Sequence, residues 1–224
     1  MSEITHDVRT MGYVLRRTNY GEADRILNII TPNGKVSAIA KGVRKEKSKL
    51  AGSIEMLTRI DFNIHRGKGE LGVITGAKMI KYFGNIIKDY SRTELATSIL
   101  KKINQLSDSS DNPEYYDIVD QSMEALNDNT NLNLIKTWIN FNIKKSSGEE
   151  INLYRDIEGN RLEPTKKYEW DYYEKSLKEK ENGLITANEI KAMRLILTNK
   201  LKTVAKIKNI DEHISPIFSI SEAI

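Results

Sequence analysis

Five cations within nine positions are the residues whose spacing best suggests a chemical role. They are Lys41, Arg44, Lys45, Lys47 and Lys49, and Glu46 is the single opposing charge among them. A row of cations can follow a phosphate backbone and release its condensed counterions, so this cluster predicts contact with nucleic acid. Cations near the ends of other strand-like segments extend the candidate surface to Arg16, Arg17, Lys35, Arg66 and Lys68. The alternative is an ordinary solvated surface without a partner.

Aromatic side chains near these cations could offer stacking faces to bases. The candidates are Tyr13, Tyr20 and Phe62. Tyr13 and Phe62 suit a hydrophobic core equally well, so both interpretations stay open at this point.

Other patterns that could support catalysis or metal binding are weak. The segment GKGELG at 67–72 matches G-x-G-x-x-G, but strand-like residues follow it, whereas a dinucleotide site requires a helix there. A glycine-rich hairpin turn is therefore expected. The three histidines lie far apart in the sequence and cysteine is absent, which excludes disulfides and thiolate zinc sites. We predict no catalytic residue, no cofactor and no metal site.

Charge is distributed unevenly along the 224 residues. Residues 1–83 hold 15 Lys and Arg against 8 Asp and Glu, whereas residues 84–224 hold 20 against 23. This asymmetry predicts a basic N-terminal unit that meets a polyanion and a second unit with another role. The lack of cysteine, of a signal-like start and of a long apolar stretch makes a cytoplasmic location the expectation.

The predicted secondary structure around the cations changes from strands to helices near residue 84. The first part contains five strand-like runs with turn residues between them: 11–20, 24–32, 35–43, 56–67 and 70–80. Their even spacing predicts a small closed or nearly closed β-barrel. Helical periodicity follows at 85–107, 112–128, 131–148 and 186–207, with a hairpin expected at 151–164 around Glu158-Gly159-Asn160. The predicted fold is α+β, with a barrel domain at 1–83 and a helical domain at 84–224.

Several segments of the barrel region resemble one known family. They are the Tyr20-Gly21-Glu22 segment, the Thr31 to Gly34 turn, the Ala40-Lys41-Gly42 segment leading to Arg44 and Ser48, and the Gly67-x-Gly69-Glu70-Leu71 turn. In this order and spacing they resemble the bacterial DNA repair and recombination mediators of the RecO family, over about residues 8–80. The later segment NEIKAMRLIL at 188–197 is similar to a late helix of that family.

The resemblance implies an N-terminal OB-fold of five strands and a C-terminal helical domain. It implies a DNA-binding mediator rather than an enzyme, acting in the bacterial cytoplasm at the nucleoid. Such proteins bind single- and double-stranded DNA, anneal complementary strands and engage the single-stranded-DNA-binding protein. With RecR they help to load the RecA recombinase. Two alternatives remain, namely an OB-fold RNA-binding module and a small nucleic-acid-modifying enzyme.

The sequence departs from the family pattern in two places. Many members carry a four-cysteine zinc element in the helical domain, whereas this chain has no cysteine and the expected hairpin at 151–164 stands in that position. Many members also have Gly-Tyr-x-Pro after the mid-domain helix, whereas Gly148 is followed by Glu149, Glu150 and Ile151.

A partner site is expected on the helix at 131–147. An acidic tail with an apolar end needs an apolar slot with cations at its rim. Trp138 and Phe141 could form the slot, and Lys144 and Lys145 the rim. The alternatives are plain core packing for the two aromatic residues and a complement to the helix dipole for the two lysines.

Overall fold

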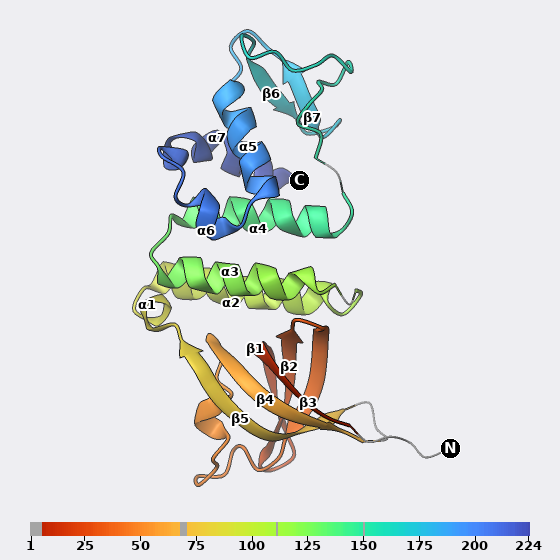
Figure 1. Ribbon diagram of the computed structural model, residues 1–224, viewed down its shortest axis with the longest axis vertical. Helices are drawn as coiled ribbons and strands as arrows, with labels where there is room; N and C mark the ends of the chain where they lie inside the picture. The colour runs from red at the N-terminus through yellow and green to blue at the C-terminus, as the bar shows by residue number, and fades with distance from the viewer. Residues whose placement is uncertain (1–5, 68–70, 111, 150) are drawn as a thin grey trace, which may run out of the picture. The chain divides into compact units, whose positions relative to one another are not determined.

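The computed structural model describes residues 6–67, 71–110, 112–149 and 151–224. Its Cα packing divides the chain into two compact units, Met1–Asn127 and Asp128–Ile224. The first unit contains a barrel and three helices, and the second contains four helices and a two-stranded sheet among the described residues (Figure 1).

The barrel has the five strands that the sequence predicts. They are β1 (His6–Tyr20), β2 (Asp24–Thr31), β3 (Gly34–Ala40), β4 (Thr58–Arg66) and β5 (Gly72–Tyr82). The sheet closes in the order β1-β2-β3-β5-β4, and all its pairs are antiparallel except the short parallel pair of β3 with β5. This is an OB-like barrel, and the predicted fold class is confirmed.

The first strand holds the barrel closed because it pairs on both sides. Its first half pairs with β4 and its second half with β2, so that Tyr13 is opposite both Arg59 and Ile30. Gly12 lies where the two pairings meet, and a Cβ atom there would approach the carbonyl oxygen of Ile30 to 2.5 Å. A residue without a side chain is therefore required at this position.

The core of the barrel follows from strand alternation. On β4, the inward positions Ile60, Phe62 and Ile64 are buried, as period-two patterning predicts. The segment between β3 and β4 also contributes, since Val43 and Ile54 belong to the same buried cluster. A short 3-10 turn, η1 (Ala51–Ser53), lies in this segment.

Three helices belong to the same compact unit as the barrel. They are α1 (Gly84–Ile87), α2 (Tyr90–Leu106) and α3 (Glu114–Asn127). The buried Tyr13 hydroxyl donates to Asp120 on α3 at 2.7 Å, and Arg59 donates to the same carboxylate at 2.7 Å. Burial and the neighbouring Asp120 carboxylate both raise the pKa of Tyr13, so its hydroxyl stays a donor. The change from strands to helices at 83/84 thus lies inside the first unit, which extends to Asn127.

The second unit is built around α4. Its elements are α4 (Leu132–Ser146), β6 (Tyr168–Asp171), β7 (Ser176–Glu179), α5 (Ala187–Thr198), α6 (Leu201–Val204) and α7 (Ile210–Ala223). Both α5 and α7 pack against α4, and α7 packs against α5. The helix α7 was not among the predicted elements, and it buries Ile210, Ile214, Ile217 and Ile220.

Two predicted elements of this unit differ in the structure. The hairpin expected at 151–164 is a tight turn with one isolated bridge between Arg155 and Arg161, and the paired strands lie later, at 168–179. The turn is held by the Asp156 carboxylate, which accepts from the N–H groups of Glu158 and Asn160. The helix expected at 186–207 breaks at Asn199, whose backbone is extended. None of the helices within the described ranges is long and apolar enough to span a membrane.

Candidate nucleic-acid interface

The basic loop, defined here as residues 41–49, is anchored to the barrel by its backbone and one buried side chain. Val43 is buried in the barrel core. The N–H of Gly42 donates to the Asp24 carboxylate at 2.7 Å, and the N–H of Arg44 donates to the Ala23 carbonyl at 2.9 Å. Gly42 has a φ of 63°, a left-handed conformation that glycine adopts without strain. The sequence therefore fixes the loop at a defined place on the barrel.

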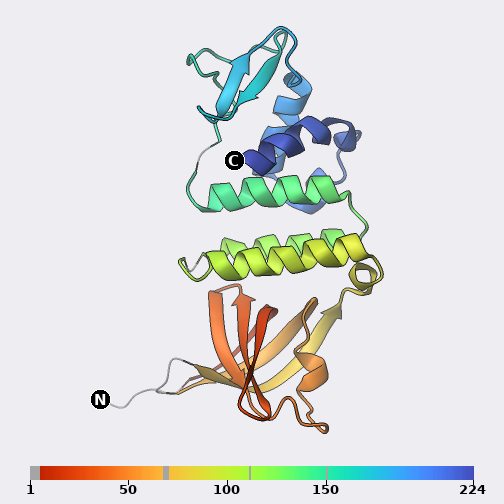
Figure 2. The same cartoon turned by 180° about the vertical axis from the view of Figure 1, so that it is seen from behind.

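All five cations of the basic loop point to solvent. Lys41, Arg44, Lys45, Lys47 and Lys49 are exposed, and so is the single acidic residue, Glu46. Burial of Val43 while its neighbours remain exposed turns the charged side chains outward. Seen from both sides, the segment that contains this loop lies at the end of the barrel away from α2 and α3 (Figures 1 and 2).

The turn between β1 and β2 lies beside the basic loop. The Arg44 guanidinium donates to the Gly21 carbonyl at 3.2 Å, which joins the two segments. Tyr20, directly before Gly21, has 54% of its surface exposed. Arg16 is exposed on the same strand. This part of the surface thus combines cations with one accessible aromatic ring.

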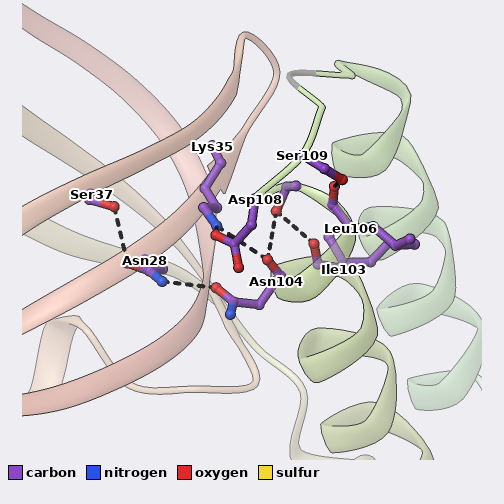
Figure 3. A network of polar contacts seen from close by, with 9 residues as sticks. Asn28, Lys35, Ser37, Ile103, Asn104, Leu106, Asp108 and Ser109 are labelled. Atoms are coloured by element: carbon purple, nitrogen blue, oxygen red, sulfur yellow. Dashed lines mark hydrogen bonds and ion pairs between the residues drawn. The ribbon is translucent and has the colours of Figure 1, made fainter.

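Two of the predicted cations are held by carboxylates of the first unit. Arg17 forms an ion pair with Glu55 at 2.5 Å, and both side chains remain partly exposed. Lys35 forms an ion pair with Asp108, and its ammonium also donates to the Asn104 carbonyl at 3.2 Å (Figure 3). Only 10% of the Lys35 side chain is exposed. Lys35 therefore connects the barrel to the C-terminal end of α2 instead of presenting a charge to solvent.

The remaining predicted cations lie at the end of β4. Arg66 is exposed. Val73 of β5 pairs with His65 of β4 on one side and with Ile39 of β3 on the other. The end of β4 that carries Arg66 is therefore separated from the end of β3 by one strand, β5. Lys68 lies outside the described residues. The stacking candidates Tyr13 and Phe62 are core residues with about 1% exposure each, so Tyr20 alone of the three is available to a base.

The predicted partner slot on α4 is closed. Trp138 and Phe141 are 3% and 0% exposed, and the Trp138 indole N–H donates to the Asn199 carbonyl at 3.0 Å. Both aromatic residues therefore serve the core of the second unit. Lys144 is bound to Glu149 at 2.9 Å, and Lys145 donates to the Leu197 carbonyl at 3.2 Å.

An apolar cavity with cations lies next to that position. It has a volume of about 680 Å³, and its lining includes Lys145, Ile151, Leu153, Arg194 and Leu197. The Arg194 guanidinium lies 4.5 Å from the ring centre of Tyr154, which also lines the cavity, and donates to the Leu153 carbonyl. Glu149 at the rim carries an ion pair to Lys144, which holds the pKa of that carboxyl below its ordinary value. The sequence pattern indicates Lys144 and Lys145 on α4 as candidate cations. It does not indicate Arg194, because this residue belongs to α5 and reaches the cavity only through the packing of the two helices.

The fold and the site agree with one class of protein. An OB-like barrel with an exposed cationic loop is an arrangement that occurs among nucleic-acid-binding proteins. Among the described residues, no group of three or more His, Cys, Asp or Glu side chains could hold a metal ion.

Comparison with known proteins finds similarity to one family. Residues 1–83 match the family described as Recombination protein O N terminal. The chain is 28% identical over 222 residues to the DNA repair protein RecO of Dehalococcoides mccartyi (strain CBDB1), covering 91% of this chain and 83% of that protein. It is 34% identical over 119 residues to the DNA repair protein RecO of Rubrobacter xylanophilus, covering 53% and 48% respectively. Over most of its length the chain is therefore similar to proteins described as DNA repair protein RecO, and its first 83 residues match the recombination protein O family.

Proposed function

We propose that this chain is a DNA-binding recombination mediator. It binds single- and double-stranded DNA through the basic loop, anneals complementary strands and helps to load a RecA-type recombinase onto protein-coated single strands. The observation that carries this proposal is the anchored loop with five exposed cations on an OB-like barrel, in a chain whose first 83 residues match the recombination protein O family.

The contact is expected to be electrostatic and independent of sequence. Lysines in a solvent-exposed loop meet phosphates as mobile point charges and do not fix a base-edge hydrogen-bond pattern. Arg44 is oriented by the Gly21 carbonyl, and Tyr20 beside it supplies a stacking face that suits single strands. Arg16 and Arg66 extend the same surface, whereas Arg17 and Lys35 contribute mainly to the fold.

The experiment is a salt titration of DNA affinity with Lys45, Lys47 and Lys49 changed to Glu. Each lost phosphate contact lowers the slope of log affinity against log salt by about 0.7 for single strands and about 0.9 for duplex. The matched control changes three exposed lysines elsewhere, Lys88, Lys101 and Lys167, to Glu. A slope that falls equally in both variants, or in neither, would remove the basic loop from the interface.

The two alternative functions give different outcomes in related assays. A nucleic-acid-modifying enzyme would cut or alter labelled DNA in the presence of Mg²⁺, whereas a mediator leaves both strands intact. An RNA-binding module would prefer RNA over DNA of the same sequence in direct competition. Annealing and recombinase loading are measured on strands coated with the single-stranded-DNA-binding protein of the same cell.

Partners are proposed on the same basis. We infer that a RecR-like protein and the single-stranded-DNA-binding protein bind this chain. The cavity beside Lys145 and Arg194 suits an acidic tail with an apolar end, since its apolar lining is bordered by two cations.

The test for this cavity is titration of a labelled tail peptide into the full chain. Lys145→Glu should weaken binding and its salt dependence, because the charge at the rim is reversed. Lys167→Glu, the same change at an exposed site away from the cavity lining, should leave binding unchanged. Equal affinity in the two variants would place the tail elsewhere.

A further inference from the structure

The second compact unit contains a long segment with cations and no acidic residue. Residues 128–224 are almost balanced, with 16 Lys and Arg against 15 Asp and Glu. Between Glu189 and Asp211, however, there are six cations and no carboxylate. Four of the six lie within nine residues: Lys200, Lys202, Lys206 and Lys208. We call residues 199–209, which contain these four, the lysine turn.

The fold fixes the lysine turn with its apolar residues inward. Leu201 and Val204 of α6 are fully buried. The Asn199 carbonyl accepts from the buried Trp138 indole, which holds the start of the segment on α4. Successive backbone bonds, from Ala205 to Leu201 and from Ile207 to Val204, continue the helical turns. All four lysines lie on the exposed side of this segment.

The lysines of this turn differ from other lysines of the same unit in their partners. Lys144, Lys166, Lys175 and Lys180 each have a carboxylate within ion-pair distance. Among the described residues, no ion pair involves any of the four lysines of the turn. Their charges are therefore not compensated by the part of the fold that the structure describes, and they are available to an external anion.

We propose that the lysine turn is a second binding surface for the phosphate backbone of a nucleic acid strand, carried by the second unit and separate from the basic loop. No large apolar side chain is exposed between residues 199 and 209. A protein interface or a membrane-inserting surface would need such side chains at its centre, whereas backbone binding needs only cations.

A second surface gives the chain a way to hold two strands at once. This step rests on the proposed annealing function. Two strands bound to the two units of one chain meet at an effective concentration far above that in solution, and pairing is then an intramolecular event. The strand on the basic loop and the strand on the lysine turn need no sequence recognition, because base pairing itself selects the partner.

The experiment counts strands bound per chain by native mass spectrometry. Thymine-only oligonucleotides are used so that strands cannot pair with each other. The chain should bind two strands, and the Lys202→Glu, Lys206→Glu variant should bind one. The control, Lys167→Glu with Lys178→Glu, changes the same charge on exposed residues of the same unit and should bind two. A second variant, Lys202→Gln with Lys206→Gln, only neutralises the charges. It should also weaken capture of the second strand, and it serves as the test if charge reversal perturbs the fold.

Each further outcome decides one of the two proposals. Two strands on the Lys202→Glu, Lys206→Glu variant, or a single strand on the unaltered chain, would overturn the second surface. The second surface would also be overturned if the Lys202→Glu, Lys206→Glu variant lost binding to anionic lipid vesicles while its binding of oligonucleotides stayed the same. If the basic-loop variant still binds two strands while the lysine-turn variant binds one, the second surface stands and the assignment of the basic loop fails. Annealing of complementary strands should slow about tenfold or more in the lysine-turn variant relative to its control.

Discussion

Replacing Lys35 by Met is expected to destabilise the first unit and to leave DNA binding almost unchanged. Methionine preserves the apolar stem and removes the ammonium. That group bonds to the Asn104 carbonyl at 3.2 Å and pairs with Asp108. The surrounding network continues from Asn104 to Asn28 at 2.9 Å and from Ser37 to Asn28 at 3.1 Å (Figure 3).

The magnitude follows from the exposure of the two partners. A hydrogen bond from a charged group contributes about 1.5–3 kcal/mol when its partner is buried, and Asn104 is buried. The Asp108 side chain is 64% exposed, so its ion pair is screened and adds at most about 1 kcal/mol. We expect a loss of about 1.5–3 kcal/mol in the free energy of unfolding, most of it from the bond to the Asn104 carbonyl. In a unit of this size that lowers the melting temperature by about 5–15 °C.

The assay pairs thermal unfolding with the salt dependence of DNA affinity. Lys41→Met is the matched control, because Lys41 is exposed and its charge belongs to the basic loop. Lys35→Met should lower the melting temperature at constant salt slope. Lys41→Met should lower the slope by about 0.7 at constant melting temperature. A Lys35→Met protein that keeps its stability and loses slope would refute the structural role assigned to Lys35.

Three further results are expected. Asp120→Ala should destabilise the first unit by about 1–3 kcal/mol in chemical denaturation, because the buried Tyr13 hydroxyl and Arg59 lose their common acceptor; unchanged stability would show that another group accepts these bonds. Burial alone would raise the pKa of Glu189, but bonds from Thr186 and His213 hold it below its ordinary value of 4.5. Its contribution to stability is therefore complete above that value and is lost as pH falls through the folded-state pKa. The melting temperature of Glu189→Gln should consequently fall less on acidification than that of the unaltered chain, and parallel curves would contradict this. A chelator should leave the melting temperature unchanged, whereas stoichiometric zinc in elemental analysis would contradict a metal-free fold.

The barrel could be predicted from sequence because its signals are local. On β4, alternation of Ile60, Phe62 and Ile64 with polar residues reports one buried face, and the Asn33-Gly34 turn separates β2 from β3. The attachment of α1–α3 to the barrel could not be predicted in this way. It depends on pairs such as Tyr13 with Asp120, which lie 107 positions apart in the sequence. No spacing rule connects residues at that distance.

The errors in the second unit have local causes. A strong turn sequence predicts the hairpin at 151–164, but the segment around Asp156 closes through side-chain to backbone bonds and forms a single isolated bridge instead of a ladder. The actual strands are only four residues long, too short for a clear alternation. The helical pattern after Thr186 continues through Asn199, yet the backbone there is extended and its carbonyl serves Trp138. The helix therefore ends at Asn199 because of a tertiary contact with Trp138, although the helical periodicity of the sequence continues.

The candidate site shows what sequence can and cannot supply for an electrostatic function. The sequence gives the number of cations and their order, and the basic loop was found because its cations are adjacent. Availability of a charge depends instead on whether the fold brings a carboxylate to it. In sequence, Lys35 and Lys41 are equally good candidates for a phosphate contact. In the structure, the ammonium of Lys35 forms an ion pair with Asp108, 73 positions away. The lysines around α6 show the reverse case. Lys200, Lys202 and Lys206 fall within the helix predicted at 186–207, where no sequence pattern marks them, and in the described part of the fold they are exposed and have no ion pair. For a chain that binds a polyanion, the interface is therefore the set of cations that remain uncompensated after folding.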